Sequence, residues 1–230
     1  MTRGSVVSAA VPCRESTGAR AVTETLDVLV ERARALAATG ERRILGLVGT
    51  PGSGKSTVSS AIAGAMRSEV VVVGMDAFHL ANRELIRLGR RERKGAPDTF
   101  DVDGYATLLA RLRAPQVAGL YAPIFDRGLE ESISSAILVT DSVPLVVTEG
   151  NYLLSDGNGW ESIARHLDEI WFIEIDAAER RERLLRRRVS YGHAPDAAAR
   201  WVDEVDEPNA RLVELTRDRA DLVVTIAPGD

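Results

Sequence analysis

A glycine-rich turn between an apolar run and a helical pattern constrains this chain more than any other feature. Residues 44–48 are apolar, residues 49–56 read Gly-Thr-Pro-Gly-Ser-Gly-Lys-Ser, and the pattern from Ser56 to Met66 is typical of a helix. The turn matches G-x-x-x-x-G-K-[ST], in which small residues let successive backbone N–H groups curve around phosphate oxygens. The helix that follows turns its positive N-terminal end toward the anion. The segment therefore predicts a strand, a phosphate-binding loop and a helix.

Each polar residue type in this loop has its own expected task. Lys55 would reach the β- and γ-phosphates of a nucleotide, and Ser56 would ligate Mg²⁺. A flexible Gly/Ser linker is the plain alternative, but a linker is not normally flanked by a buried strand and a long helix. ATP and Mg²⁺ are therefore the expected cofactors, and the loop residues expected to hold them are Gly49, Gly52, Ser53, Gly54, Lys55, Ser56 and Thr57.

Apolar runs alternate with helical patterns along the rest of the chain. Candidate buried strands are residues 70–74, 145–148, 170–175 and 221–226. With the run before the phosphate loop they predict a mostly parallel five-stranded sheet, covered by helices as a three-layer α/β sandwich of the P-loop NTPase type. The run 136–140 precedes Asp141-Ser-Val-Pro144 and predicts a hairpin partner or an edge strand.

The domain organisation follows from the same patterns. Apolar residues at helical spacing, ended by Gly40, predict an N-terminal helix over residues 21–39. Residues 1–20 are interpreted as a disordered lead-in, because their apolar run is too short for a signal sequence. Residues 21–230 are expected to form a single domain. Two of its stretches, 83–103 and the Arg-rich and then acidic 179–207, are candidates for moving parts over the site.

Composition favours a small-molecule partner. The chain has 29 Lys and Arg against 34 Asp and Glu, a net charge of −5, which argues against sequence-independent binding to nucleic acid. Cys13 is the only cysteine, so a disulfide framework is excluded and a reducing cytoplasm is the expected compartment. No run of eighteen apolar residues indicates a membrane span. Oligomeric state stays open, with a homodimer as one option.

Two acidic residues stand where predicted strands end. Asp76 follows residues 70–75 and Glu149 follows residues 145–148. Ligands of open parallel sheets bind beyond the carboxyl ends of the strands, so both acids are expected to face the phosphate loop. Asp76 suits a general base, and Glu149 suits a contact to Mg²⁺. A single acid in such a place is often only a helix cap, and His79 is equally suited to substrate contact and to an ordinary loop.

Several ordered motifs together carry a resemblance to a known family. From about Ile44 to its C-terminus, the chain resembles the phosphoribulokinase/uridine kinase family of P-loop kinases, which includes the bacterial pantothenate kinases. Besides the phosphate loop, the motifs are Met75-Asp-Ala-Phe-His79, Arg93-Lys-Gly-Ala-Pro-Asp-Thr-Phe-Asp101, Ala122-Pro-Ile-Phe-Asp126, Val147-Thr-Glu-Gly-Asn-Tyr152 and the arginine-rich stretch after Asp176.

The resemblance implies roles for individual residues. Asp76 would be the catalytic base, Asp98 would bind substrate hydroxyls, and Glu149 would lie near the metal. The stretch 179–207 would be a helical lid, and its Arg183 and Arg187 would join Lys55 in neutralising charge on the transferred phosphoryl group. Residues 201–209 would border the adenine. The full set expected to bind the substrate is Asp76, His79, Lys94, Asp98, Asp101, Phe125 and Arg127.

The expected activity is ATP-dependent transfer of a phosphoryl group to a hydroxyl of a small metabolite. Gly95-Ala-Pro-Asp98 lacks the His that uridine kinases carry there, and Asp76-Ala-Phe-His79 differs from the Asp-Gly-Phe-Leu of pantothenate kinases. The patterns look closest to a bacterial branch labelled nucleoside/nucleotide kinase or sugar-transport-associated kinase, which leaves a nucleoside, a pantothenate-like compound and a sugar open. A P-loop ATPase or nucleotide switch is the alternative, although no Asn-Lys-x-Asp or Leu-Ser-Gly-Gly motif is present.

Overall fold

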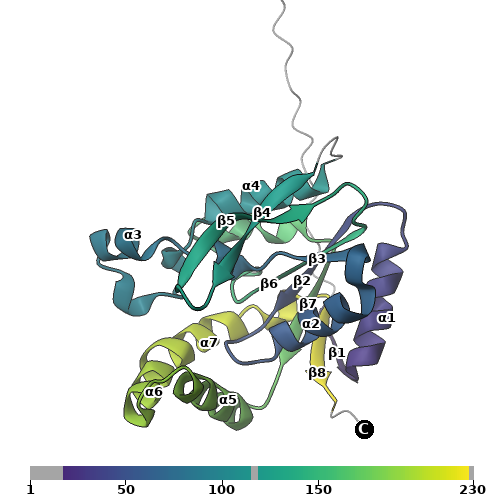
Figure 1. Ribbon diagram of the computed structural model, residues 1–230. Coiled ribbons are helices and arrows are strands. Elements are labelled where there is room, and N and C mark those ends of the chain that lie inside the picture. Colours follow the sequence, from purple (N-terminus) through teal and green to yellow (C-terminus); the bar gives the residue numbers. More distant parts are fainter. Residues whose placement is uncertain (1–17, 115–118, 228–230) are drawn as a thin grey trace, which may run out of the picture.

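The computed structural model describes residues 18–114 and 119–227, so nearly all of the expected lead-in over residues 1–20 lies outside the described residues. Strands and helices alternate along most of the chain (Figure 1). The strands are β1 (Arg20–Glu24), β2 (Arg43–Val48), β3 (Val70–Val72), β4 (Leu120–Asp126), β5 (Glu131–Val139), β6 (Leu145–Gly150), β7 (Glu169–Glu174) and β8 (Leu222–Ile226). The α-helices are α1 (Leu26–Ala37), α2 (Lys55–Met66), α3 (Asn82–Arg87), α4 (Val102–Arg113), α5 (Ala177–Ser190), α6 (Pro195–Trp201) and α7 (Glu207–Glu214).

The main sheet of the described residues has six strands in the order β1-β8-β7-β2-β6-β3, and every pair in it is parallel. Strand β2 lies inside the sheet, where Leu47 is in register with Glu149 of β6 and with Trp171 of β7. Because the strands are parallel, their carboxyl ends meet at one edge, and the loop after β2 opens at that edge.

Side chains alternate along the strands between two hydrophobic layers. Ile44 and Val48 of β2 belong to the layer that includes Leu109 of α4, whereas Leu45 and Leu47 belong to the layer built with α1 and α2. The two layers lie on opposite faces because successive strand residues point to opposite sides. Figure 1 shows α1 and α2 on one side of the sheet and α4 on the other, which confirms the three-layer α/β sandwich.

The predicted strand count and the start of the first helix were both wrong. Residues 20–24 form strand β1, paired with β8 at the edge of the sheet, and helix α1 begins only at Leu26, with Thr25 as its N-cap. The sequence Arg-Ala-Val-Thr-Glu of β1 is half polar and carries no buried apolar run. Its strand conformation therefore depends on the backbone of β8, which local sequence patterns do not include.

The run at residues 136–140, predicted to be a hairpin partner or an edge strand, lies at the end of a hairpin strand. Strand β5 pairs with β4 in a separate two-stranded antiparallel sheet, in which Leu120 is in register with Val139. Strand β6, which follows β5 in the chain, joins the main sheet between β2 and β3. The turn Asp141–Pro144 thus connects two sheets, and the short loop at Arg127 closes the hairpin beside the ligand-binding edge.

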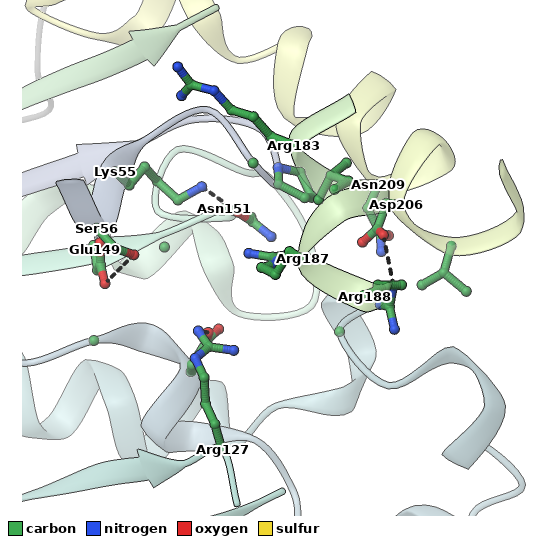
Figure 2. Close-up of a pocket in the computed structure, with 18 of the residues that line it drawn as sticks. Lys55, Ser56, Arg127, Glu149, Asn151, Arg183, Arg187, Arg188, Asp206 and Asn209 are labelled. Carbon is green, nitrogen blue, oxygen red and sulfur yellow. Dashed lines mark hydrogen bonds and ion pairs between the residues drawn. The ribbon is translucent and has the colours of Figure 1, made fainter. Parts of the chain in front are cut away.

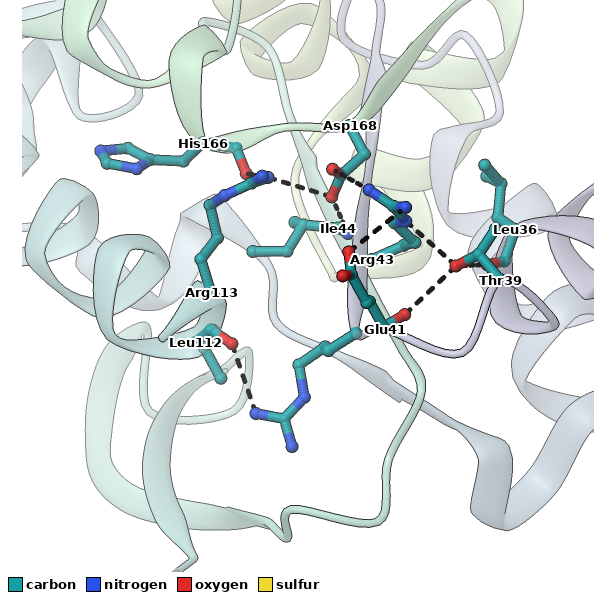
Figure 3. A network of polar contacts seen from close by, with 10 residues as sticks. Leu36, Thr39, Glu41, Arg43, Ile44, Leu112, Arg113, His166 and Asp168 are labelled. Atoms are coloured by element: carbon teal, nitrogen blue, oxygen red, sulfur yellow. Dashed lines mark hydrogen bonds and ion pairs between the residues drawn. The ribbon is translucent and has the colours of Figure 1, made fainter. Parts of the chain in front are cut away.

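At the opposite edge of the sheet, Asp168 joins three elements (Figure 3). Its Oδ2 accepts a hydrogen bond from the backbone N–H of Ile44 at 2.7 Å, and Arg43 and Arg113 approach the carboxylate at 3.2 and 3.0 Å. These contacts tie the start of β2 and the end of α4 to the loop before β7. The network is structural, because it lies at the amino ends of the strands, away from the phosphate loop.

Within the described ranges, none of the helices combines the length and the apolar character that crossing a bilayer requires.

Candidate active site

The loop between β2 and α2 is shaped by glycines. Gly54 has φ +103° and stands directly before α2, in a backbone conformation that side chains rarely adopt. A Cβ on Gly49 would lie 2.5 Å from the carbonyl oxygen of Ile173. The loop can therefore follow this path only with glycine at these places, and it leaves its N–H groups at the N-terminus of α2 available to an anion.

Ser53 supplies a second sign that the loop is built around a ligand. Its Oγ is buried and has no hydrogen-bond partner among the described residues. Buried hydroxyls are normally paired, so an unpaired one inside an anion-binding loop fits a phosphate oxygen as its missing partner. The predicted ATP-binding loop therefore has both the shape and the free donors that a phosphate requires.

Lys55 is held at the mouth of the loop by oxygen acceptors. Its Nζ donates to the carbonyl oxygens of Gly49 and Thr50 at 2.7 and 2.9 Å, and to Oδ1 of Asn151 at 2.8 Å. Burial lowers the pKa of Lys55 to about 8, although Glu149 and Asp76 favour the charged form. No role was predicted for Asn151, although it lies two residues after Glu149 and belongs to the motif Val147-Thr-Glu-Gly-Asn-Tyr152.

Ser56 and Glu149 lie together, as the predicted metal site requires. The hydroxyl of Ser56 donates to Oε1 of Glu149 at 3.1 Å, and Ser59 donates to Oε2 at 3.3 Å. Burial raises the pKa of Glu149, and nearby Lys55 opposes this rise. A hydroxyl and a carboxylate are oxygen ligands of the kind Mg²⁺ accepts, with phosphate oxygens and water completing its shell. No group of three or more His, Cys, Asp or Glu side chains suited to a metal occurs in the described part of the chain.

Asp76 follows β3 on a short 3₁₀ turn, Met75–Phe78, and faces the same cavity as the phosphate loop. Nη2 of Arg127, from the β4–β5 turn, lies 3.4 Å from its Oδ2. Figure 2 shows Arg127 reaching up from the hairpin toward this region, below Lys55 and Arg187. Two residues that the sequence assigned to the substrate are thus brought together by distant segments.

His79 and Lys94 line the cavity near Asp76. Nζ of Lys94 donates to Oδ1 of Asn82 at 2.8 Å, and burial lowers its pKa. Burial likewise lowers the pKa of His79, whose ring packs 5.1 Å from that of Phe125. Phe125 is absent from the cavity wall; it supports His79 and Lys94 from behind.

Asp98 and Asp101 do not line the cavity, unlike the other predicted polar substrate ligands. The carboxylate of Asp98 accepts from Arg93 at 2.6 Å, and this hydrogen bond lowers its pKa. Asp101 is the N-cap of α4, where its Oδ1 accepts from the N–H of Gly104 at 2.9 Å. Both carboxylates are therefore engaged by donors close to them in the chain, a guanidinium for Asp98 and a backbone N–H for Asp101.

Helix α5 brings arginines to the other side of the phosphate loop. Arg183 and Arg187 line the cavity, and Arg183 also pairs with Glu179 at 2.6 Å. Leu184, between them, is fully buried and contacts the loop near Gly52. This packing turns one face of the helix toward the phosphates and the other outward, where Arg186 pairs with Glu182 at 3.5 Å.

The cavity between these walls has a volume of about 370 Å³, within the range of small-molecule sites. Its far wall comes from the end of α5 and from the segment 201–209, including Arg188, Trp201, Asp206 and Asn209 (Figure 2). Asp206 lies in the segment expected to border the adenine, and Arg188 ends the arginine-rich stretch, but neither was singled out as a site residue. Both reach the cavity through the packing of α5 against α6 and α7.

Comparison with known proteins places the chain among kinases. No protein-family model matches it. It is 31% identical over 209 residues to "Putative uridine kinase C227.14" of Schizosaccharomyces pombe, a match covering 86% of this chain and 89% of that protein. It is 33% identical over 188 residues to the uncharacterized protein YggC of Escherichia coli, covering 80% of this chain and 77% of that protein.

A solved structure agrees. The crystal structure of a "putative fructose transport system kinase" from Silicibacter sp. TM1040 superposes with a TM-score of 0.76 and 35% identity, covering 86% of this chain and 98% of that chain. The two kinase matches therefore extend over nearly the whole length of both partners and include the phosphate loop. The chain is a small-molecule kinase and belongs to the phosphoribulokinase/uridine kinase family of P-loop kinases.

Proposed function

We propose that this kinase transfers the γ-phosphoryl group of ATP to a hydroxyl of a small metabolite, with Asp76 as the general base and residues 179–207 as a lid. The observation that carries the proposal is that Asp76, Lys55, Glu149 and Arg187 all face one cavity at the phosphate loop. They come from four separate segments, so their convergence does not follow from any single motif.

Each residue has a task in an in-line transfer. Lys55 and the loop N–H groups would hold the phosphates, while Ser56 and Glu149 would hold Mg²⁺, which neutralises phosphate charge when bound. Asp76 accepts the proton of the acceptor hydroxyl as that oxygen forms its bond to the γ-phosphorus. The bond from the γ-phosphorus to the β–γ bridging oxygen then breaks, and ADP leaves.

Arg183 and Arg187 would neutralise the charge that spreads over the transferred group. Phosphoryl transfer is catalysed mainly by positioning and by charge stabilisation, so two guanidinium groups on the opposite wall from Asp76 suit this task. Because both lie on α5, movement of α5–α7 would complete the site when the acceptor is bound.

The names of the relatives suggest which acceptors to test. One is named for uridine, one structure for a fructose transport system, and a 26% identical protein of Chelativorans sp. is named pantothenate kinase. The experiment measures ADP release by the purified chain with Mg-ATP and uridine, pantothenate, fructose, other sugars or glycerate. The proposal expects one compound to stimulate turnover in the wild type and not in Asp76→Asn. If none does, and slow ATP hydrolysis is the same in Asp76→Asn, a P-loop ATPase or switch replaces it.

A further inference from the structure

One ion pair in the cavity wall is left incomplete. Nε of Arg188 lies 3.5 Å from Oδ2 of Asp206, and the two side chains are only 19% and 10% exposed. Both atoms are buried, yet neither has a hydrogen-bond partner among the described residues. A buried carboxylate and a buried guanidinium both lose hydration, and a contact of this length without hydrogen-bond geometry recovers little of it. A ligand that accepts a hydrogen bond from Arg188 and donates one to Asp206 would supply the partners that both groups lack.

The pair lies toward the end of α5 that is farther from the phosphate loop. Helix α5 runs from the phosphate loop, where Arg183 stands 3.6 Å from a Cβ built on Gly54, to Arg188 at the far end. There the negative charge of Glu130, in the β4–β5 turn that also carries Arg127, favours the charged form of Arg188. Figure 2 shows Arg188 beside Asp206, with Arg187 between this pair and Lys55.

The local backbone holds the pair in place. Asp206 ends a π-helical turn, Val202–Asp206, between α6 and α7, and such turns are frequent at functional sites. The guanidinium of Arg188 stacks over Trp201 at 4.3 Å, which fixes its plane. Asn209, also in the cavity wall and 7% exposed, adds an amide beside the carboxylate.

The opposite wall repeats the same chemistry. Asp76 and Arg127 also form a carboxylate–guanidinium pair, with 3.4 Å between Oδ2 and Nη2. A hydroxyl is the simplest group that donates to a carboxylate and accepts from a guanidinium at once. An anionic group would meet the carboxylate in either pair, and a cationic group would meet the guanidinium. Both walls therefore suit neutral hydroxyl groups.

We infer that Asp206 and Arg188 bind a second hydroxyl of the acceptor while its reacting hydroxyl lies at Asp76. The acceptor is then a neutral sugar or polyol with at least two hydroxyl groups. This inference rests on the proposed transfer from ATP, but it concerns binding and is tested without turnover. Asp206 is a specificity-determining residue of the acceptor site, and it does not border the adenine.

The test is calorimetric titration of the full chain, saturated with Mg²⁺ and a non-hydrolysable ATP analogue. The probes are fructose, ribose and sorbitol, with glycerate as the anionic comparison. The matched control is Asp203→Asn, which alters the same π-helical turn at an exposed residue paired with Arg181, outside the cavity. Asp206→Glu keeps the charge and serves as a second variant.

We expect Asp206→Asn to weaken binding of the preferred sugar or polyol by about tenfold to a hundredfold, as loss of a hydrogen bond to a charged group does. The analogue's affinity should stay within about twofold, and Asp203→Asn should match the wild type. Without ligand, Asp206→Asn should melt lower than the wild type, because it leaves the buried guanidinium of Arg188 without its counter-charge. Binding is therefore compared at a temperature at which every variant is folded, and Asp206→Glu, which keeps the charge, should melt closer to the wild type.

Three outcomes would overturn the inference. The first is that the wild type binds none of the neutral probes. The second is that Asp206→Asn loses affinity for the ATP analogue, as a contact to the adenine would require. The third is that Asp203→Asn loses as much sugar affinity as Asp206→Asn. Failure of the proposed transfer is a separate result, because it shows as sugar binding without any Asp76-dependent ADP release.

Discussion

Arg127 and Asp76, 51 positions apart in the chain, meet with 3.4 Å between Nη2 and Oδ2. Their side chains remain 54% and 43% exposed, so water and ligands can reach both. The proposed base therefore already has a partner before an acceptor arrives. On the proposed mechanism an acceptor hydroxyl would take up part of this contact, so we expect Arg127 to orient the acceptor against Asp76.

Replacing Arg127 should thus affect the acceptor more than ATP. We expect Arg127→Gln to raise KM for the acceptor about tenfold, because one charge-assisted hydrogen bond is lost, with KM for ATP changed by less than about twofold. Arg83→Gln, on exposed α3 and outside the cavity wall, is the matched control. Steady-state kinetics with both substrates varied gives the two constants, and an equal rise in both KM values would show that Arg127 is not directed at the acceptor.

The lowered pKa of Lys55 predicts a pH dependence of nucleotide binding. Its pKa is about 8 in the free protein, and bound phosphates favour the charged form, so binding should take up a proton above that pH. Affinity for a non-hydrolysable ATP analogue should fall as pH rises past about 8, by up to tenfold per unit. Calorimetry at several pH values measures this. The arginine of Lys55→Arg stays charged, so this variant should lose the fall in affinity above pH 8. If the variant's affinity still falls with pH as in the wild type, another group is responsible.

The lowered pKa of Lys55 also affects the stability of the fold, which should rise with pH where nucleotide affinity falls. Between about 8 and the ordinary value of 10.5, the unfolded chain holds a proton on Lys55 that the folded chain has released. The contribution of Lys55 to the free energy of unfolding therefore rises with pH across this window.

The two faces of α5 predict different effects for neighbouring arginines. We expect Arg187→Ala to lower kcat about a hundredfold or more while affinity for the ATP analogue changes little, because its charge is needed when the phosphoryl group transfers. Arg186→Ala removes an outward residue, 67% exposed and paired with Glu182, and should keep kcat near the wild-type value. Single-turnover kinetics compares them. Equal losses would point to a general effect of helix charge.

Replacing glycine by alanine should have opposite effects at two positions, Gly49 and Gly64. A methyl group on Gly49 would lie 2.5 Å from the backbone oxygen of Ile173, so Gly49→Ala must displace the phosphate loop and should abolish nucleotide binding. Gly64 lies exposed within α2, with nothing within 4 Å of an added Cβ. Gly64→Ala should raise the free energy of unfolding by about 0.5–1 kcal/mol. Denaturant unfolding and analogue binding test both, and wild-type binding by Gly49→Ala would contradict the tight approach.

Local sequence predicts those parts of the site whose geometry is set within a few residues. The phosphate loop is one, because Gly54, Lys55 and Ser56 act through their own backbone and the helix that begins there. Asp76 and Glu149 are others, because a residue after a parallel strand must reach the ligand edge. The three-layer sandwich follows from the same alternation of apolar runs and helical patterns.

Long-range packing decides the remainder. Strand β1 pairs along the edge that β8 offers, and β5 pairs with β4, the strand directly before it in the chain. Asp98 and Asp101 looked like ligands by type but are engaged by Arg93 and the start of α4. Asp206, in contrast, was predicted only as part of the segment 201–209, and its side chain reaches the cavity through helix packing.

The fate of the γ-phosphate tests the central claim most directly. The wild type and Asp76→Asn are each incubated with Mg-ATP labelled in its γ-phosphate and with the preferred sugar or polyol, and the products are separated. We predict that the wild type places the label on the acceptor, and that Asp76→Asn forms this product about 10²–10⁴-fold more slowly while binding the ATP analogue normally. Label found only as inorganic phosphate, at the same rate in both proteins, would contradict Asp76-dependent transfer to an acceptor.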